Sequence, residues 1–109
     1  MKRLQNKTAV LTGASRGIGY AILNKLAEEG ADVIACSSKK TEELEQNYSE
    51  IEKKYGVKIT PVFFDLSDET SVKDGIKEIK ELKVPIDILV NNAGMGKISL
   101  LAFTKMSDA

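Results

Sequence analysis

The sequence predicts an α/β fold with a doubly wound parallel sheet, built in the order β-α-β-α-β-α-β. Four short apolar runs alternate along the chain with three stretches in which apolar residues recur every three or four positions. The fourth run, residues 86–91, is almost continuously apolar, which is typical of a strand buried on both faces. Right-handed helical crossovers would join such strands into a Rossmann-type sheet of order 3-2-1-4. A ligand crevice is expected between strands one and four, where the order reverses.

The first strand is expected over residues 8–11, and the first helix over residues 18–29 with Gly30 as its stop. The expected buried face of this helix consists of Ile18, Ala21, Ile22 and Leu26. Between strand and helix, the chain from Thr12 to Gly19 reads T-G-x-x-x-G-x-G. Glycine lets the backbone approach a ligand closely, and the first turn of a helix presents unpaired N–H groups at the positive end of its dipole. The stretch therefore predicts a pyrophosphate site, with an ordinary tight turn as the alternative.

The second strand is expected over residues 32–36, and the second helix begins after an N-cap at Thr41. The apolar residues of that helix are Leu44, Tyr48, Ile51 and Tyr55. The third strand, residues 57–64, contains Pro61, which indicates an edge position because proline cannot donate to a strand ladder. Ser67 is expected to cap the third helix, whose apolar residues are Val72, Ile76 and Ile79.

Composition excludes several classes of site. The chain of 109 residues is about one small domain long, and its 16 basic residues balance 16 acidic ones, so no basic excess indicates nucleic-acid binding. It has one cysteine, Cys36, and no histidine, so neither an internal disulfide nor a Cys/His metal site is expected. We find no signal-like or membrane-spanning apolar run, and we expect a cytoplasmic protein without membrane contact.

The residues after the second strand favour a phosphorylated cofactor. A dinucleotide site that selects a ribose 2′-hydroxyl usually carries a carboxylate here, but this chain reads Cys36-Ser37-Ser38-Lys39-Lys40. Hydroxyl donors and cations, together with Arg16 in the glycine turn, suit a 2′-phosphate. The sequence therefore predicts NADP(H) over NAD(H). The alternative is a polar loop with solvated lysines.

Two further groups follow the third and fourth strands. Asp65 can accept a hydrogen bond from an adenine amino group, with Leu66 beside it, or it can form an Asx turn ahead of Ser67. Asn91-Asn92-Ala93-Gly94 can line a ribose and nicotinamide, because small residues permit close approach, or it can be a simple turn.

Taken in order, the glycine turn, Asp65-Leu66 and Asn91-Asn92-Ala93-Gly94 resemble the short-chain dehydrogenase/reductase family from Thr8 to at least Gly94. The string Gly13-Ala14-Ser15-Arg16-Gly17-Ile18-Gly19 resembles its 3-oxoacyl-carrier-protein reductase branch. The resemblance implies hydride transfer between NADP(H) and a carbonyl or alcohol carbon of a small-molecule or acyl-thioester substrate. It also implies a homotetramer or homodimer.

On this resemblance, the cofactor-binding residues fall into four groups. The pyrophosphate and 2′-phosphate would be held by Gly13, Ser15, Arg16, Gly17, Ile18 and Gly19. Ser37 and Ser38 would also bind the 2′-phosphate, and Asp65 and Leu66 would line the adenine pocket. Asn91, Ala93 and Gly94 would line the ribose and nicotinamide end.

The family's catalytic tyrosine, with a lysine four residues later, has no counterpart in this sequence. The residues four positions after the three tyrosines are Asn24, Glu52 and Ile59. No catalytic residue is therefore assigned. The chain is expected to be the N-terminal half of a longer single-domain enzyme and to contain a truncated sheet. The alternatives are a non-catalytic NADP(H)-binding module and a fragment that pairs with another chain.

Overall fold

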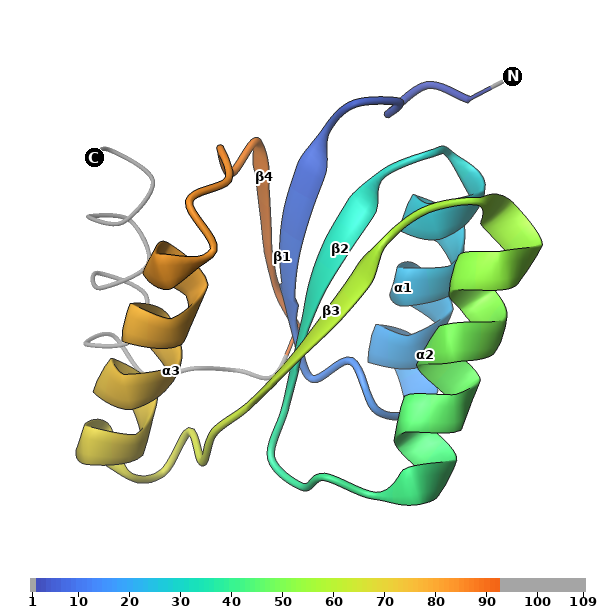
Figure 1. Ribbon diagram of the computed structural model, residues 1–109. Helices are drawn as coiled ribbons and strands as arrows, with labels where there is room; N and C mark the ends of the chain where they lie inside the picture. Colours follow the sequence, from blue (N-terminus) through green and yellow to red (C-terminus); the bar gives the residue numbers. More distant parts are fainter. Residues whose placement is uncertain (1, 93–109) are drawn as a thin grey trace.

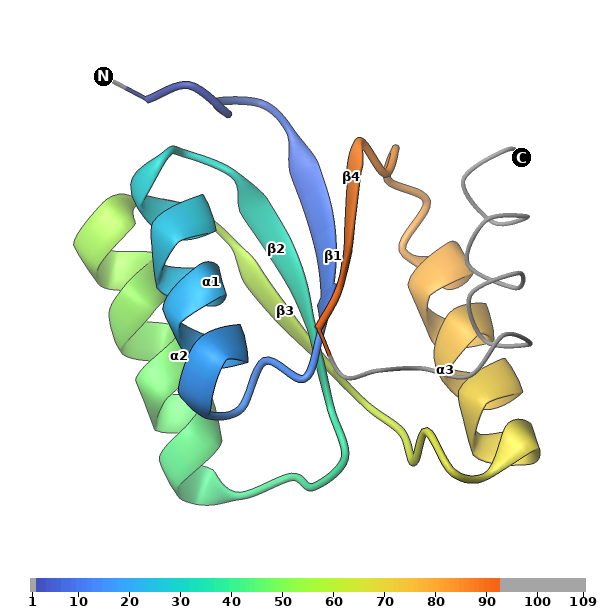
Figure 2. The ribbon, with the colours of Figure 1, turned by 180° about the vertical axis from the view of Figure 1, so that it is seen from behind.

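The computed structural model describes residues 2–92 and shows one parallel sheet between two layers of helices. The strands lie in the order β3-β2-β1-β4, as predicted. Helices α1 and α2 cover one face of the sheet, and α3 covers the other (Figures 1 and 2). The elements are β1 (Thr8–Thr12), α1 (Gly17–Glu28), β2 (Asp32–Ser37), α2 (Glu42–Tyr55), β3 (Ile59–Phe63), α3 (Glu69–Glu81) and β4 (Ile88–Asn91).

The two central strands are buried on both faces, because their side chains alternate between two apolar cores. On β1, Val10 packs into the core beneath α3, whereas Leu11 packs into the core beneath α1 and α2. β1 pairs in parallel with both β2 and β4, so Thr12 lies opposite Cys36 on one side and Asn91 on the other. The register brings the carboxyl ends of three strands together.

The buried face of α1 differs from the prediction. Ile22 and Leu26 pack against the core as predicted, but Ile18 is 75% exposed and Ala21 is exposed. The fully buried side chains are instead those of Leu23 and Ala27. Gly19 explains this rotation: it is buried against the glycine turn, and residues four apart lie on the same side of a helix. Because only glycine fits against the turn, the close approach of Gly19 determines which face of α1 meets the sheet.

The predicted cap of α2 is confirmed, and that of α3 is wrong. Thr41 Oγ1 accepts a hydrogen bond from the Leu44 backbone N–H at 3.1 Å. The N-cap of α3 is Asp68 rather than Ser67, and the Asp68 carboxylate accepts from the N–H groups of Thr70 and Ser71. Ser67 is instead engaged with a residue that precedes it, as described below.

The outer strands are shorter than predicted. β3 spans five residues rather than 57–64, and its place at the sheet edge confirms the position inferred from Pro61. β4 begins at Ile88 rather than at Ile86. Within residues 2–92, β4 pairs only with β1 and its apolar side chains are half-buried, so the expectation of burial on both faces is wrong for this part of the chain.

Candidate functional site

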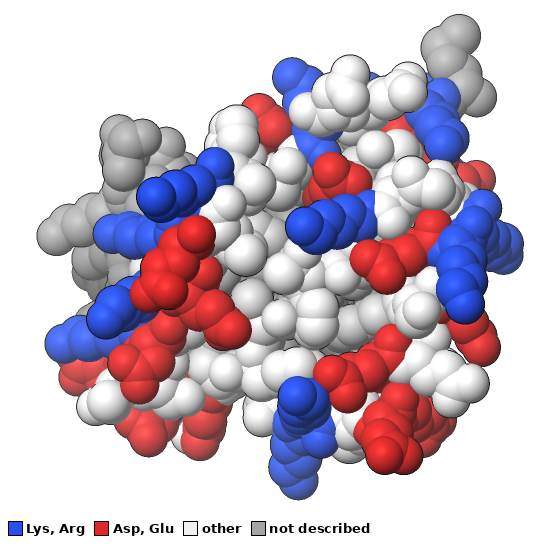
Figure 3. Space-filling model, viewed as in Figure 1, with Lys and Arg blue, Asp and Glu red and all other residues white. Residues whose placement is uncertain are grey.

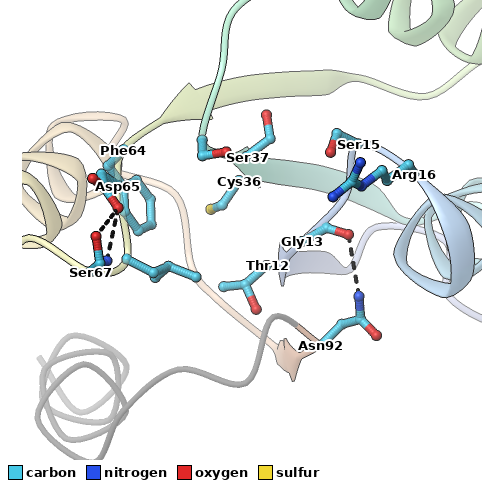
Figure 4. Close-up of a pocket in the computed structure, with 12 residues that line it drawn as sticks. Thr12, Gly13, Ser15, Arg16, Cys36, Ser37, Phe64, Asp65, Ser67 and Asn92 are labelled. Carbon is cyan, nitrogen blue, oxygen red and sulfur yellow. Dashed lines mark hydrogen bonds between the residues drawn. The ribbon is translucent and has the colours of Figure 1, made fainter.

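A cavity of about 480 Å³ lies at the carboxyl ends of the strands (Figure 4). Parallel strands place their carboxyl ends at one edge, so residues distant in sequence meet there. The lining residues are Thr12, Gly13, Ser15, Arg16, Cys36, Ser37, Ser38, Phe64, Asp65, Leu66, Ser67 and Asn92. Seven of the residues predicted to bind a cofactor are in this set, namely Gly13, Ser15, Arg16, Ser37, Ser38, Asp65 and Leu66.

The glycine turn brings the start of α1 close to the end of β1. Gly17 has a φ of 59°, a left-handed conformation that suits glycine. At Gly19 a Cβ would overlap the carbonyl oxygen of Gly13, so only glycine fits there without displacing the turn. Gly17, Ile18 and Gly19 build the turn and the first residues of α1, but they do not line the cavity.

The N-terminus of α1 lacks a side-chain cap. The N-cap residue is Arg16, whose guanidinium cannot accept a hydrogen bond, and in the described residues no side chain caps this helix. The first-turn N–H groups and the helix dipole therefore remain available to an anion at the edge of the cavity. Ser15 and Arg16 line the cavity directly beside this helix end.

A second cavity, of about 500 Å³, shares Ser15, Arg16 and Ser38 with the first. Its remaining lining residues are Lys39, Thr41, Glu43, Leu44 and Asn47. Arg16 and Lys39 bring positive charge to its wall, opposed by the carboxylate of Glu43. The Lys40 ammonium group instead forms an ion pair with Glu45, with 3.8 Å between Nζ and Oε1. The wall that the two cavities share therefore consists of two serines, Ser15 and Ser38, and one arginine, Arg16.

Asp65 forms the Asx turn that was the alternative to adenine binding. Its Oδ1 accepts hydrogen bonds from the Ser67 backbone N–H at 2.9 Å and the Ser67 hydroxyl at 2.6 Å. The Ser67 hydroxyl, followed by its N–H, lowers the pKa of Asp65. A carboxylate has about four acceptor positions, so this turn leaves Asp65 able to accept from a ligand. Asp65, Phe64 and Leu66 form the wall of the cavity at the end of β3.

The two asparagines at the end of β4 have different roles. The Thr12 hydroxyl donates a hydrogen bond of 3.3 Å to Asn91 Oδ1, which ties β1 to β4, and Asn91 does not line the cavity. Asn92 lines it, and its Nδ2 donates to the Gly13 carbonyl oxygen at 3.2 Å (Figure 4). Ala93 and Gly94, predicted to contact the ribose and nicotinamide, lie outside the described residues.

Five residues of the cavity wall were not among the predicted cofactor-binding residues: Thr12, Cys36, Phe64, Ser67 and Asn92. Each lies at the carboxyl end of a strand or within four residues after one, and this position was the available signal. Burial raises the pKa of the Cys36 thiol to about 12, with a smaller contribution from Glu78, so Cys36 contributes an uncharged surface.

Basic and acidic side chains are interspersed over the face shown in Figure 3, in keeping with the balanced composition. In the part of the chain that the structure describes, every helix is too short or too polar to cross a membrane.

Comparison with known proteins identifies the family. The sequence model of short chain dehydrogenases matches residues 7–109, which is nearly the whole chain. This protein belongs to the short-chain dehydrogenase family. The match covers the glycine turn, the strand ends that line the cavity and the asparagines at the end of β4.

Two curated relatives show the range of reactions among similar short-chain dehydrogenases. The chain is 43% identical over 105 residues to 3-oxoacyl-[acyl-carrier-protein] reductase from Aquifex aeolicus, covering 96% of this chain and 41% of that protein. It is 40% identical over 92 residues to gluconate 5-dehydrogenase from Gluconobacter oxydans, covering 84% and 35%. The chain therefore spans about two-fifths of the length of these relatives.

Solved structures of the family have the same fold. A short chain dehydrogenase from Burkholderia cenocepacia in complex with NADP superposes with a TM-score of 0.81 at 30% identity, over 97% of this chain and 51% of that one. L-sorbose reductase from Gluconobacter frateurii, complexed with NADPH and L-sorbose, superposes with a TM-score of 0.82 at 25% identity, over 97% and 48%. Members of this family are oxidoreductases.

Proposed function

We propose that this chain is the NADP(H)-binding part of a short-chain dehydrogenase that transfers a hydride between nicotinamide and a carbonyl or alcohol carbon. One observation carries the proposal. The uncapped start of α1 opens beside Arg16, and the end of β2 lines the same cavity with Ser37 and Ser38 where an NAD-selective site would place a carboxylate. Such a wall suits a ligand with two separate phosphate groups.

Different parts of the cofactor would contact different strand ends. The start of α1, with Gly17 and Gly19 shaping the turn, would hold the pyrophosphate. The boundary between the two cavities, formed by Arg16 and Ser38 with Lys39 beyond it, would hold the 2′-phosphate. Asp65 and Leu66 would contact adenine. We still propose that the ribose and nicotinamide end is lined by Asn91, Ala93 and Gly94.

The relatives support this assignment. The Burkholderia cenocepacia structure holds NADP and the Gluconobacter frateurii structure holds NADPH. Nicotinamide supplies the hydride chemistry when bound, and the described residues would bind and orient it. The relatives act on an acyl-carrier-protein thioester and on a sugar acid, so we propose a small-molecule or acyl-thioester substrate without choosing between them. We also propose a cytoplasmic homo-oligomer in the natural full-length protein.

The test is to compare NADPH and NADH binding by the protein at its natural length. The proposal expects NADPH to bind at least tenfold more tightly. Ser38→Asp should reverse the preference, because a carboxylate repels the 2′-phosphate and accepts from a ribose hydroxyl. Ser49→Asp, on α2 away from both cavities, is the matched control and should leave the ratio unchanged. Equal affinity of the unaltered protein for the two cofactors would refute the NADP(H) assignment.

The intact mass of the natural protein tests whether the chain belongs to a longer enzyme. A mass about twice that of the printed sequence is expected, with a tyrosine and a lysine four residues apart beyond Ala109. A mass equal to that of the printed sequence would favour the non-catalytic NADP(H)-binding module instead, and purified protein would then bind NADPH without reducing any carbonyl.

A further inference from the structure

The Phe64 side chain connects α3 with the cavity of about 480 Å³ at the strand ends. Phe64 directly follows β3, is 5% exposed and lines this cavity beside Asp65 (Figure 4). Its ring also belongs to the core beneath α3, together with Val72 and Ile76 of that helix. One side chain therefore borders both the helix that covers this face of the sheet and the space in which a ligand would lie.

Gly75 permits this position of the ring. It is a buried residue in the middle of α3, and the Phe64 ring lies directly against it. A Cβ at position 75 would lie 2.6 Å from Phe64 Cγ and 2.9 Å from Phe64 Cε1, closer than real Cβ atoms approach other atoms. Cγ is the atom that joins the ring to the Phe64 Cβ, so the ring could not avoid the new methyl group by moving only its far end. The place of the ring beneath α3 therefore requires a residue without a side chain at position 75.

A side chain at position 75 would push the ring toward the cavity. The Phe64 N–H donates a hydrogen bond of 3.0 Å to the Ser37 carbonyl oxygen, which holds the Phe64 backbone against the end of β2. An outward movement of α3 would instead withdraw Val72, Ile76 and Ile79 from the core, and three buried side chains would lose packing. The ring has no such packing on its cavity side. We therefore expect it to turn about the Phe64 Cα–Cβ bond into the cavity.

We propose that Gly75 is a positioning residue for the adenine end of the cofactor. Because Gly75 has no side chain, the Phe64 ring lies beneath α3, and the cavity beside Asp65 and Leu66 stays wide enough for a purine ring. The part of Phe64 that lines the cavity gives the base an apolar wall. This inference rests on the proposed binding of a nicotinamide adenine dinucleotide, but not on the 2′-phosphate, since NADPH and NADH carry the same adenine.

Four ligands distinguish an effect on adenine from a general distortion of the protein. NADPH, NADH and 5′-AMP contain adenine, whereas reduced nicotinamide mononucleotide (NMNH) contains only the nicotinamide half of NADH. A flat, rigid purine cannot adapt to a narrowed pocket, so a displaced Phe64 ring should weaken the first three ligands and leave NMNH unchanged. NADPH and NADH should weaken by the same factor, so their ratio should stay constant. A distorted sheet would weaken NMNH as well.

The test compares Gly75→Ala with Ile79→Val in the natural-length protein. Ile79 lies four residues later on the same face of α3 and does not line the cavity, so Ile79→Val disturbs the same core away from the ligand. Gly75→Ala should weaken NADPH, NADH and 5′-AMP about fivefold or more, and Ile79→Val should keep all three within about twofold. Adding Phe64→Leu to Gly75→Ala should restore the affinity, because the smaller leucine leaves room for the new methyl group.

The outcomes separate this inference from the proposed function. If the unaltered protein binds neither NADPH nor NADH, the proposed function fails and the inference fails with it. If the protein binds NADPH and Gly75→Ala keeps the full affinity, the inference alone is wrong and α3 has moved instead of the ring. An equal loss of NMNH affinity, or no recovery with Phe64→Leu, would also overturn it.

NMR of the unaltered protein provides a second test should Gly75→Ala not fold. The signals of the Phe64 ring protons should shift when 5′-AMP binds, because the ring borders the proposed adenine pocket. They should not shift with NMNH. Ring signals that stay in place with 5′-AMP, or that shift equally with both ligands, would overturn the inference.

Discussion

The side-chain amide of Asn92 donates a hydrogen bond of 3.2 Å to the carbonyl oxygen of Gly13 and joins two loops that are 79 residues apart in sequence. The contact holds the chain after β4 against the glycine turn after β1. Gly19 lies beneath it, so close that a Cβ would overlap the same carbonyl group and also approach the Asn92 amide. Three segments of the chain thus meet at one backbone oxygen beside the cavity.

Asn92→Asp should destabilise the protein by about 1–3 kcal/mol, because a carboxylate oxygen would face the Gly13 carbonyl in place of a donor. Urea denaturation at neutral pH measures the change. Asn24→Asp is the matched control, since the Asn24 amide also donates to a carbonyl, that of Tyr20, but within one helix and only four residues away. If both variants lost the same amount of stability, the contact between Asn92 and Gly13 would stabilise the protein no more than the one within α1.

Gly19→Ala should cost about 1–3 kcal/mol of stability, because the new methyl group meets backbone that cannot rotate away. The displaced turn should also weaken NADPH binding. Ala21→Ser, on the exposed side of α1, should stay within about 0.5 kcal/mol of the unaltered protein. A fully stable Gly19→Ala variant with unchanged affinity would argue against so close an approach of α1 to the turn.

Gly75→Ala has two opposing effects on α3. Alanine favours a helix interior over glycine by about 1 kcal/mol, but here its Cβ would overlap the ring of Phe64. We expect overpacking to win by about 1–2 kcal/mol, since Phe64 is 5% exposed and has little room to move. Adding Phe64→Leu should recover part of the loss. Thermal denaturation measures both variants, and a more stable Gly75→Ala protein would contradict the prediction.

Asp68→Ala should destabilise α3 by about 0.5–2 kcal/mol, because the N–H groups of Thr70 and Ser71 lose their capping carboxylate. Ser67→Ala should affect the helix less, since Ser67 bonds backward to Asp65. It should instead raise the pKa of Asp65, whose lowering depends first on the Ser67 hydroxyl. An NMR titration of the carboxylates measures this shift, and an unchanged Asp65 would rule out the hydroxyl as its cause.

Stability should fall as the pH rises from about 9 to about 12. Burial raises the pKa of Cys36 from 9.0 to about 12 and that of Tyr48 from 10.0 to about 12. The unfolded chain loses the Cys36 proton above pH 9 and the Tyr48 proton above pH 10, whereas the folded protein keeps both up to about pH 12. Within its own window each group therefore favours unfolding by about 1.4 kcal/mol per pH unit. Urea denaturation at pH 8 and pH 10 measures the decline. Cys36→Ala should remove most of it, and an equal decline in that variant would exclude Cys36 as its source.

Several site assignments depended on contacts that no local pattern contains. Asn91 and Asn92 are adjacent and identical, yet one bonds to Thr12 and the other lines the cavity. Asp65 could have been an adenine acceptor or part of an Asx turn, and the hydrogen bond from the Ser67 N–H to its carboxylate shows that the turn forms. In both cases the residue types by themselves allowed two outcomes.

Local signals determined the topology. Apolar periodicity, the cap at Thr41 and the glycine pattern from Gly13 to Gly19 act within a few residues, so the sequence alone predicted the strand order, the glycine turn before α1 and the edge position of Pro61. The tertiary structure decided which face of α1 is buried and which asparagine reaches the cavity. These depend on steric fit and hydrogen bonds between distant segments, whose energies exist only once the sheet has brought the strand ends together.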